Sequence, residues 1–386
     1  MLNLHENRYI PRTLERNLRQ YLGSFPVTAI TGPRQSGKST MLKNVLPDYT
    51  YVSLDDFRVL ELFNDDPEKF MRIYNDRIIF DEAHLAPKLF TWLKIAVDKD
   101  RNNYGKFVLT GSAQFTLLKN ITESLAGRIG LLSLLPFQYS EIPEPLRRDS
   151  VYKGSYPELV LRNYASANAW YSSYVETYLN KDIRSVSAIG DLSSFRKFIS
   201  LLATRCSQIL NMSELARDLG INVPTVKRWI SVLEASYIVF LVQPYYNNLG
   251  KRLYKAPKLY FHDTGLVSYL LRVDRREDFE NGPMHGPLFE NYLVSEIMKK
   301  ELHAGSFAAL YYLRTNHGSE VDLILERGQQ REWIEIKAGE TFRQAMVKTI
   351  EKLKKPEEKG YLLYNGQTVR YTEDIAVWNY REYLER

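Results

Sequence analysis

The chain has 386 residues, a length that allows two or three domains, each with its own hydrophobic core. Its single cysteine, Cys206, excludes a disulfide framework and a cysteine-based zinc site, and its net charge of +6 favours an anionic partner. No apolar run approaches the roughly 18 residues that span a membrane, and residues 1–6 lack the apolar core of a signal peptide. We therefore expect a cytoplasmic enzyme with no membrane partner.

Residues 1–140 alternate between apolar, β-branched segments and helical patterns. This alternation predicts an α/β fold in which a mostly parallel sheet is covered by helices on both faces. Strands are expected at 27–31, 50–54, 77–81, 106–110 and 131–137.

The first of these strands leads into the sequence GPRQSGKS at 32–39, which matches the phosphate-binding pattern GxxxxGK[ST]. A glycine-rich turn at a helix N-terminus directs backbone N–H groups toward anionic oxygens, so this segment predicts ATP binding. Lys38 is expected to reach the β- and γ-phosphates, and the Ser39 hydroxyl is expected to bind Mg²⁺. The complete predicted nucleotide site comprises Gly32, Pro33, Arg34, Gln35, Ser36, Gly37, Lys38, Ser39 and Thr40.

Two carboxylates end the apolar strand at 78–80 and supply the second half of an ATPase site. Asp81 lies at the carboxyl end of its strand, where open α/β sheets bind ligands, and is expected to hold Mg²⁺. Glu82 follows it and is placed to polarise the attacking water. Together with the phosphate-binding pattern, these residues predict ATP hydrolysis.

The strand at 106–110 ends in polar residues that are candidates for sensing the γ-phosphate. In ATPases of this layout such a strand lies beside the strand that carries the catalytic carboxylates. Thr110 and Ser112 both fit this role, and Ser112 is preferred.

After the expected ATPase core at 1–140, residues 142–148 have the composition of an exposed connector, and 141–205 predict a tyrosine-rich helical lid. Residues 206–262 then predict a winged helix, with two short helices followed by a strand hairpin. Its candidate DNA contacts are Thr225, Lys227, Arg228, Lys251 and Arg252. Winged helices also serve as lids and protein-docking modules, so the motif does not by itself settle DNA binding.

The last domain, expected at 283–386, has a helix followed by three strands. Asp322 interrupts an apolar strand, and Glu335 and Lys337 alternate on the next strand, so they face the same side. This order, with Glu290 on the preceding helix, is the pattern of the PD-(D/E)xK nuclease fold, in which carboxylates bind Mg²⁺. The alternative is an inactive centre in a structural or DNA-holding module.

The chain resembles a widespread prokaryotic family of AAA-type ATPases that join an ATPase core to a C-terminal domain of uncharacterised function. The resemblance rests on segments spread over nearly the whole chain: GPRQSGKST at 32–40, LDD at 54–56, IIFDEAH at 78–84, LTGSA at 109–113, LAGR at 125–128, LPFQYSE at 135–141, GSYPE at 154–158, FEN at 289–291 and EVDLILE at 320–326. It implies an AAA-like core, a winged helix and a nuclease-like domain. It also implies Arg128 as the arginine that contacts the γ-phosphate, with Arg184 as a rival. An arginine supplied in trans would require a homo-oligomer.

These observations lead to one main hypothesis and two alternatives. The main hypothesis is a DNA-directed ATPase that hydrolyses ATP with Mg²⁺ and carries a candidate C-terminal nuclease. The first alternative is an ATP-dependent switch whose nuclease-like domain is an inactive docking or DNA-binding module. The second is a transcription regulator that uses the winged helix for sequence-selective binding.

Overall fold

The computed structural model describes residues 9–111, 114–179, 192–245, 256–306, 308–315 and 318–386. The chain divides into two compact units. The first comprises residues up to 137 together with 302–305, and the second comprises 138–301 and 306–386.

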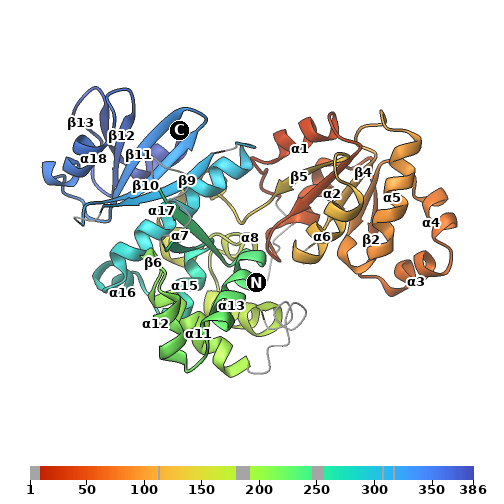
Figure 1. Ribbon diagram of the computed structural model, residues 1–386, viewed down its shortest axis with the longest axis horizontal. Helices are drawn as coiled ribbons and strands as arrows, with labels where there is room; N and C mark the ends of the chain where they lie inside the picture. Colours follow the sequence, from red (N-terminus) through yellow and green to blue (C-terminus); the bar gives the residue numbers. More distant parts are fainter. Residues whose placement is uncertain (1–8, 112–113, 180–191, 246–255, 307, 316–317) are drawn as a thin grey trace, which may run out of the picture. The chain divides into compact units, whose positions relative to one another are not determined.

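The first unit is built on a five-stranded parallel sheet with the strand order β2-β3-β4-β1-β5 (Figure 1). Its strands are β1 (Val27–Thr31), β2 (Thr50–Ser53), β3 (Ile78–Asp81), β4 (Phe107–Thr110) and β5 (Ile129–Ser133). Its helices are α1 (Glu15–Leu22), α2 (Lys38–Val45), α3 (Phe57–Asp65), α4 (Pro67–Ile73), the 3-10 turn η1 (Ala83–Leu85), α5 (Pro87–Lys99) and α6 (Gln114–Ser124).

Alternate residues of the central strands pack into two hydrophobic cores, one on each face of the sheet. On one face Phe80 and Leu109 pack with residues of α3, α4, α5 and α6. On the other face Ile79 and Val108 pack with residues of α1 and α2. The sheet is therefore covered on both sides, which explains why its strands read as apolar runs rather than as alternating patterns.

The sequence predictions for this unit are confirmed for the α/β class, the parallel sheet and four strands. The fifth strand differs, because the prediction placed it at 131–137 and β5 runs from Ile129 to Ser133. The last residue pair between β5 and β1 is Ser133 opposite Thr31. Because β1 ends at Thr31, the residues after Ser133 have no strand residues of β1 to pair with. Pro136 could not donate to a ladder in any case.

The second unit begins with helices where the sequence indicated a connector. Residues 142–148 were expected to be an exposed connector, but α7 starts at Glu144, with Pro145 in its first turn. The prediction was wrong because proline in the first helical turn costs no hydrogen bond and so favours a helix start as much as a loop. In chain order, the helical segments of this part are the turn η2 (Tyr139–Glu141), α7 (Glu144–Lys153), α8 (Pro157–Leu161), α9 (Ala167–Tyr174), the π-helical turn η3 (Val175–Leu179) and α11 (Leu192–Thr204).

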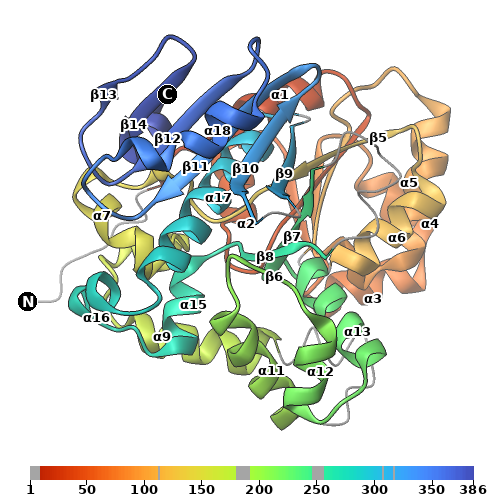
Figure 2. The same ribbon diagram turned by 60° about the vertical axis from the view of Figure 1, so that its left-hand side comes forward.

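Helix α11 packs with two further helices, α12 (Met212–Leu219) and α13 (Val223–Ala235), which lie beside it in Figure 2. Asn211 and Asn222 cap these helices by accepting hydrogen bonds from the backbone of Glu214 and Thr225. Three antiparallel strands adjoin them: β6 (Gln208–Ile209), β7 (Val239–Pro244) and β8 (Lys258–Phe261), with β8 in the middle.

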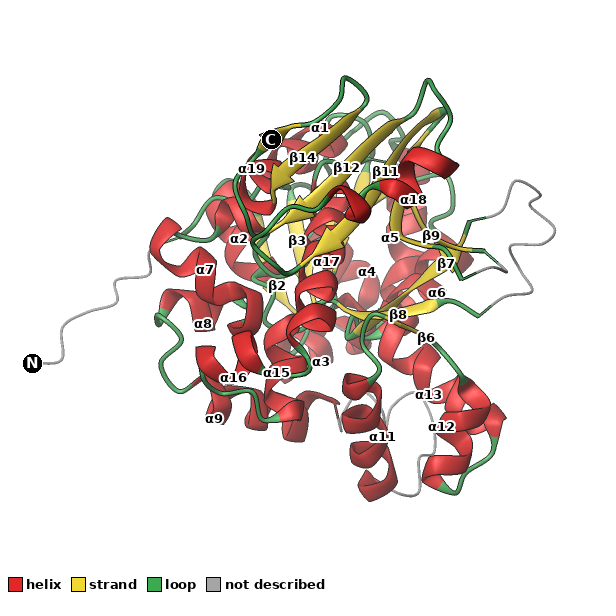
Figure 3. Cartoon of the chain, turned by 90° about the vertical axis from the view of Figure 1, so that its left-hand side faces the viewer, coloured by secondary structure: helices red, strands yellow, loops and turns green. Residues whose placement is uncertain are grey.

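These strands continue into a nine-stranded sheet with the order β13-β14-β12-β11-β10-β9-β7-β8-β6 (Figure 3). The added strands are β9 (Ala309–Arg314), β10 (Glu320–Arg327), β11 (Gln330–Lys337), β12 (Lys359–Tyr364), β13 (Val369–Arg370) and β14 (Ile375–Asn379). The remaining helical segments are α15 (Thr264–Leu271), α16 (Arg276–Asn281), α17 (His285–His303), η4 (Gln344–Met346), α18 (Lys348–Leu353) and α19 (Tyr380–Glu385). Within the described part of the chain, no helix is both long and apolar enough to cross a membrane.

Candidate functional site

The phosphate-binding loop joins the end of β1 to the start of α2, as the sequence predicts. Gly37 precedes the helix with φ 93°, and Gly32 has φ 140°, both in the region that favours glycine. A side chain at Gly32 would place its first carbon 2.1 Å from the carbonyl oxygen of Leu134. The loop therefore needs glycine at both positions, and its backbone lies at the carboxyl edge of the sheet, where α/β proteins bind ligands.

Lys38 is held inside this loop. Its ammonium donates hydrogen bonds to the carbonyl oxygens of Gly32 and Pro33, at 3.0 and 2.7 Å, and the residue is buried. The chain thus places a compact positive charge within the loop where the phosphates of a nucleotide would lie.

The carboxylate of Asp81 accepts hydrogen bonds from three hydroxyl groups. Ser39 donates to Oδ2 at 2.9 Å and Thr110 donates to Oδ1 at 2.5 Å. Tyr51, on β2, also donates to Oδ2. Burial and the bond to Asp81 both raise the pKa of Tyr51 above its ordinary value, so it stays a donor. Ser39 and Asp81 supply hard oxygen ligands, which fits the Mg²⁺ expected here.

Glu82 follows Asp81 and adopts a left-handed backbone conformation with φ 53°. Such a conformation is strained for a residue other than glycine and is often found at functional sites. Its carboxylate Oε2 lies 3.1 Å from Nδ1 of His84. Glu82 therefore lies directly after the carboxylate that is expected to hold Mg²⁺, with the imidazole of His84 close to its side chain.

The predicted γ-phosphate sensors have different outcomes. Thr110 contacts Asp81 directly, whereas Ser112, the residue preferred from sequence, lies outside the described residues. The threonine is buried at the end of β4, next to β3.

Arg128 makes a bidentate ion pair with Asp98, with Nε–Oδ1 and Nη2–Oδ2 distances of 2.7 and 3.0 Å. It immediately precedes β5, whose first residue, Ile129, lies opposite Val27 at the start of β1. The phosphate-binding loop follows the other end of β1, so the structure does not bring Arg128 to its own loop. Its rival Arg184 lies outside the described residues.

Sequence reasoning missed Arg12, which supports the loop from a distant part of the chain. Its guanidinium donates to the carbonyl oxygens of Ser36 and Leu135 at 2.8 and 2.7 Å and lies 4.8 Å from the centre of the Phe137 ring. The arginine is buried, and it precedes every strand of the sheet, so no motif marks it.

Three of the candidate DNA contacts lie on α13. Lys227 and Arg228 are exposed there, and Thr225 is half-buried in the first turn. Lys251 and Arg252 lie outside the described residues.

The four residues proposed for the nuclease-like centre come together in the second unit. Lys337 lies 2.6 Å from Glu335 and 3.5 Å from Asp322, across the β10–β11 pair. Asp322 also accepts a hydrogen bond from the backbone N–H of Ile336 at 2.8 Å. Glu290, on α17, is linked to Asp322 by a lysine that the sequence analysis did not identify, Lys258.

Burial governs the acidic groups of this centre. It raises the pKa of Glu335 to about 8 and that of Glu290 to about 7, and the charge of Asp322 adds to both shifts. Burial acts to lower the pKa of Lys258, but the charges of Glu290, Asp322 and Glu320 outweigh it and raise that pKa.

The residues of this centre do not fit the Mg²⁺ ion that the sequence pattern predicts. In the parts of the chain that the structure describes, no three His, Cys, Asp or Glu side chains are grouped so that they could hold a metal ion. The ammonium of Lys258 lies among the carboxylates instead. Glu290, Asp322, Glu335 and Lys337 thus lie close together, with the ammonium groups of Lys258 and Lys337 beside the carboxylates.

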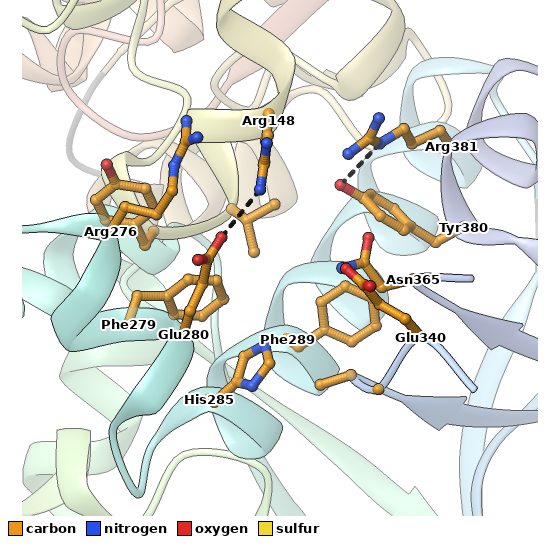
Figure 4. Close-up of a pocket in the computed structure, with 14 residues that line it drawn as sticks. Arg148, Arg276, Phe279, Glu280, His285, Phe289, Glu340, Asn365, Tyr380 and Arg381 are labelled. Carbon is orange, nitrogen blue, oxygen red and sulfur yellow. Dashed lines mark hydrogen bonds and ion pairs between the residues drawn. The ribbon is translucent and has the colours of Figure 1, made fainter. Parts of the chain in front are cut away.

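A separate cavity of about 230 Å³ lies in the same unit (Figure 4). Arg148, Arg276 and Arg381 lie on one side of it, and Phe279 and Phe289 are among its aromatic residues. Its volume is below the roughly 300–1,000 Å³ of typical ligand pockets, and no residue of the predicted sites lines it.

The first unit therefore has the loop, the lysine and the paired carboxylates of a P-loop ATPase. Residues 24–143 match the family model of the AAA domain, which supports ATPase activity. Residues 144–277 and 285–383 match two domains of unknown function, DUF8612 and DUF4143.

The chain is 30% identical over 336 residues to the uncharacterized protein Rv2008c of Mycobacterium tuberculosis, covering 86% of this chain and 74% of that protein. The same values hold for the uncharacterized protein Mb2031c of Mycobacterium bovis. The chain belongs to the family of these proteins, which is an AAA-type ATPase family. Among solved structures, the Walker-type ATPase PABY2304 of Pyrococcus abyssi is similar, with 15% identity, a TM-score of 0.49, and 69% of this chain and 97% of that chain covered.

Proposed function

We propose that the protein is an ATP-binding and ATP-hydrolysing enzyme directed at DNA. The observation that carries the ATPase part is the position of Asp81, which accepts hydrogen bonds from Ser39 of the phosphate-binding loop and from Thr110 of the neighbouring strand. A loop hydroxyl and a strand-end carboxylate in contact are the pair that holds Mg²⁺ in P-loop enzymes.

Each residue of this site has a distinct role in the proposal. The backbone of the loop from Gly32 to Thr40 holds the phosphates, and Lys38 neutralises the β- and γ-phosphates. Bound Mg²⁺ supplies charge stabilisation at the phosphates, with Ser39 and Asp81 as its protein ligands. Glu82 accepts a proton from the attacking water.

Hydrolysis across subunits is part of the same proposal. Arg128 lies beyond the amino end of β5, on the opposite edge of the sheet from its own phosphate-binding loop. It is therefore proposed to contact nucleotide only in a neighbouring copy, which requires a homo-oligomer.

The DNA part of the proposal rests on α11–α13 and strands β6–β8. Along the chain these elements follow the order of a winged helix: a helix, a strand, two helices and then two strands. Lys227 and Arg228 are exposed on α13, the second helix of the helix-turn-helix pair, where they can contact phosphates.

An ATPase assay with duplex, single-stranded and branched DNA tests this part. We expect at least one DNA to accelerate hydrolysis, and the double variant Lys227→Ala/Arg228→Ala to lose that acceleration while it keeps the rate without DNA. The matched control is Lys88→Ala/Lys94→Ala, which removes two exposed lysines from α5. Indifference of the wild-type rate to all three DNAs would contradict DNA-directed action.

The alternative function is an ATP-dependent switch that acts on a protein partner. The observation that favours it is the C-terminal centre, in which Lys258 and Lys337 lie among the carboxylates. We therefore propose that the C-terminal domain holds DNA or docks a partner, and we do not assign it the nuclease activity that its sequence pattern predicts. Slow, DNA-independent hydrolysis by a protein that co-purifies with a partner would favour the switch.

A further inference from the structure

Lys258 is a buried lysine at the start of β8. Strand β8 pairs with β6 on one side and with β7 on the other, so Lys258 lies opposite Ile209 and Val242. Its side chain is only 3% exposed. The backbone of Lys258 is therefore fixed by two ladders, and its side chain cannot turn out into water as a surface lysine does.

Three carboxylates surround the ammonium of Lys258. Its Nζ lies 2.5 Å from Glu320, 3.1 Å from Glu290 and 3.8 Å from Asp322. Glu290 comes from α17 and the other two from β10, so the lysine joins a helix to a strand. Tyr260, two residues along β8, donates to the same oxygen of Glu290 at 2.7 Å.

The ammonium of Lys258 lies among carboxylate oxygens in the way that a metal ion lies among its oxygen ligands. A buried group of carboxylates needs positive charge close by, which comes from a metal ion or from a paired cationic side chain. Here Lys258 supplies it on one side of Asp322 and Lys337 on the other, 3.5 Å away. A divalent ion among the same oxygens would be repelled by both ammonium groups.

We propose that Lys258 is a built-in cation that takes the place of a divalent metal in the C-terminal carboxylate centre. The native chain then binds no Mg²⁺ or Mn²⁺ at Asp322, and the centre serves as a metal-free linkage between α17, β8 and β10. The proposal concerns the C-terminal module of the proposed function and is independent of ATP hydrolysis in the first unit.

The test is Mn²⁺ binding to the full chain without nucleotide. It is measured by titration calorimetry and by the loss of the electron paramagnetic resonance signal of free Mn²⁺. The wild type and Asp322→Asn are expected to bind the same amount of Mn²⁺. Lys258→Met, which has an unbranched side chain one atom shorter and removes the charge, is expected to gain about one equivalent. Lys258→Met/Asp322→Asn is expected to lose that gain.

Two further variants keep the test decisive. Lys359→Met makes the same change at an exposed lysine of strand β12 in the same sheet and should gain no Mn²⁺. If Lys258→Met does not fold by circular dichroism, Lys258→Met/Glu320→Gln removes one of the carboxylates left without a counter-charge and takes its place in the titration.

Either of two results would overturn the proposal. The first is a wild-type protein that loses one Mn²⁺ equivalent on Asp322→Asn, which would show that the native centre binds metal. The second is a folded Lys258→Met that binds no more Mn²⁺ than the wild type. Neither result bears on ATP hydrolysis, and a failed ATPase assay would leave the Mn²⁺ titration unchanged.

Discussion

The hydroxyl of Thr110 donates a hydrogen bond of 2.5 Å to Oδ1 of Asp81, and both groups are buried. Thr110 ends β4 and Asp81 ends β3, and these neighbouring strands are parallel, so the two side chains meet at the carboxyl edge of the sheet. The other carboxylate oxygen of Asp81, Oδ2, accepts hydrogen bonds from Ser39 and Tyr51. Thr110 therefore fixes the orientation of the carboxylate that is proposed to hold Mg²⁺.

Thr110→Val should lower the rate of ATP hydrolysis by roughly 10- to 100-fold, because groups that orient a metal ligand typically have effects of this size. The measurement is steady-state phosphate release over a range of Mg²⁺ concentrations. Thr28→Val is the matched control, since Thr28 is also buried in the sheet and its Oγ1 has no hydrogen-bond partner among the described residues. Equal rates for the two variants would show that the bond from Thr110 does not matter.

Arg12→Ala should destabilise the first unit by roughly 2–4 kcal/mol and weaken nucleotide binding, because two buried carbonyl groups lose their charged donor. One of those carbonyls belongs to Ser36 of the phosphate-binding loop. Thermal unfolding and the affinity for a fluorescent ATP analogue are the measurements. Arg16→Ala, at an exposed position nearby, should change neither. An Arg12→Ala protein with wild-type stability would contradict the role given to Arg12.

His262 gives the second unit a pH dependence at mildly acidic pH. Burial, with a smaller effect of the Lys299 charge, lowers the pKa of His262 to about 3, whereas an unfolded histidine has a pKa of about 6.5. Between these values the unfolded chain binds a proton that the folded chain does not, so stability falls as the pH is lowered below 6.5. Above pH 6.5 this contribution is fully present and constant.

Lowering the pH from 7 to 5 should therefore cost the wild type about 2 kcal/mol more than His262→Leu, which cannot take up the proton. Melting temperatures at several pH values between 5 and 7 measure this difference. Parallel curves for the two proteins would mean that His262 is protonated in the folded state.

The sequence predicted the ATPase core well because its signals are local. The strands are short apolar runs, the phosphate-binding loop is one continuous segment, and Asp81 and Glu82 follow a strand directly. The sequence does not distinguish Thr110 from Ser112, since both lie at the end of the same apolar run, and the structure adds the contact from Thr110 to Asp81.

Arg12 and Lys258 could not be predicted in the same way. Arg12 acts on Leu135, 123 residues further along the chain, and Lys258 contacts Glu290, 32 residues away. A charged residue inside an apolar strand was the signal that identified Asp322, and Lys258 carries the same signal at the start of Lys258-Leu259-Tyr260-Phe261. What the sequence did not give was the partner, because α17 and β10 meet β8 only in the folded chain.

The most direct test of the central claim is steady-state hydrolysis of ATP with Mg²⁺ by the wild type and by Glu82→Gln, with ATP binding measured in parallel. We predict that the wild type hydrolyses ATP and that Glu82→Gln binds it with similar affinity but turns over at least roughly 100-fold more slowly, because the general base is lost. A wild type that binds ATP without hydrolysing it, or a Glu82→Gln protein with the wild-type rate, would contradict the assignment of this site as the ATPase centre.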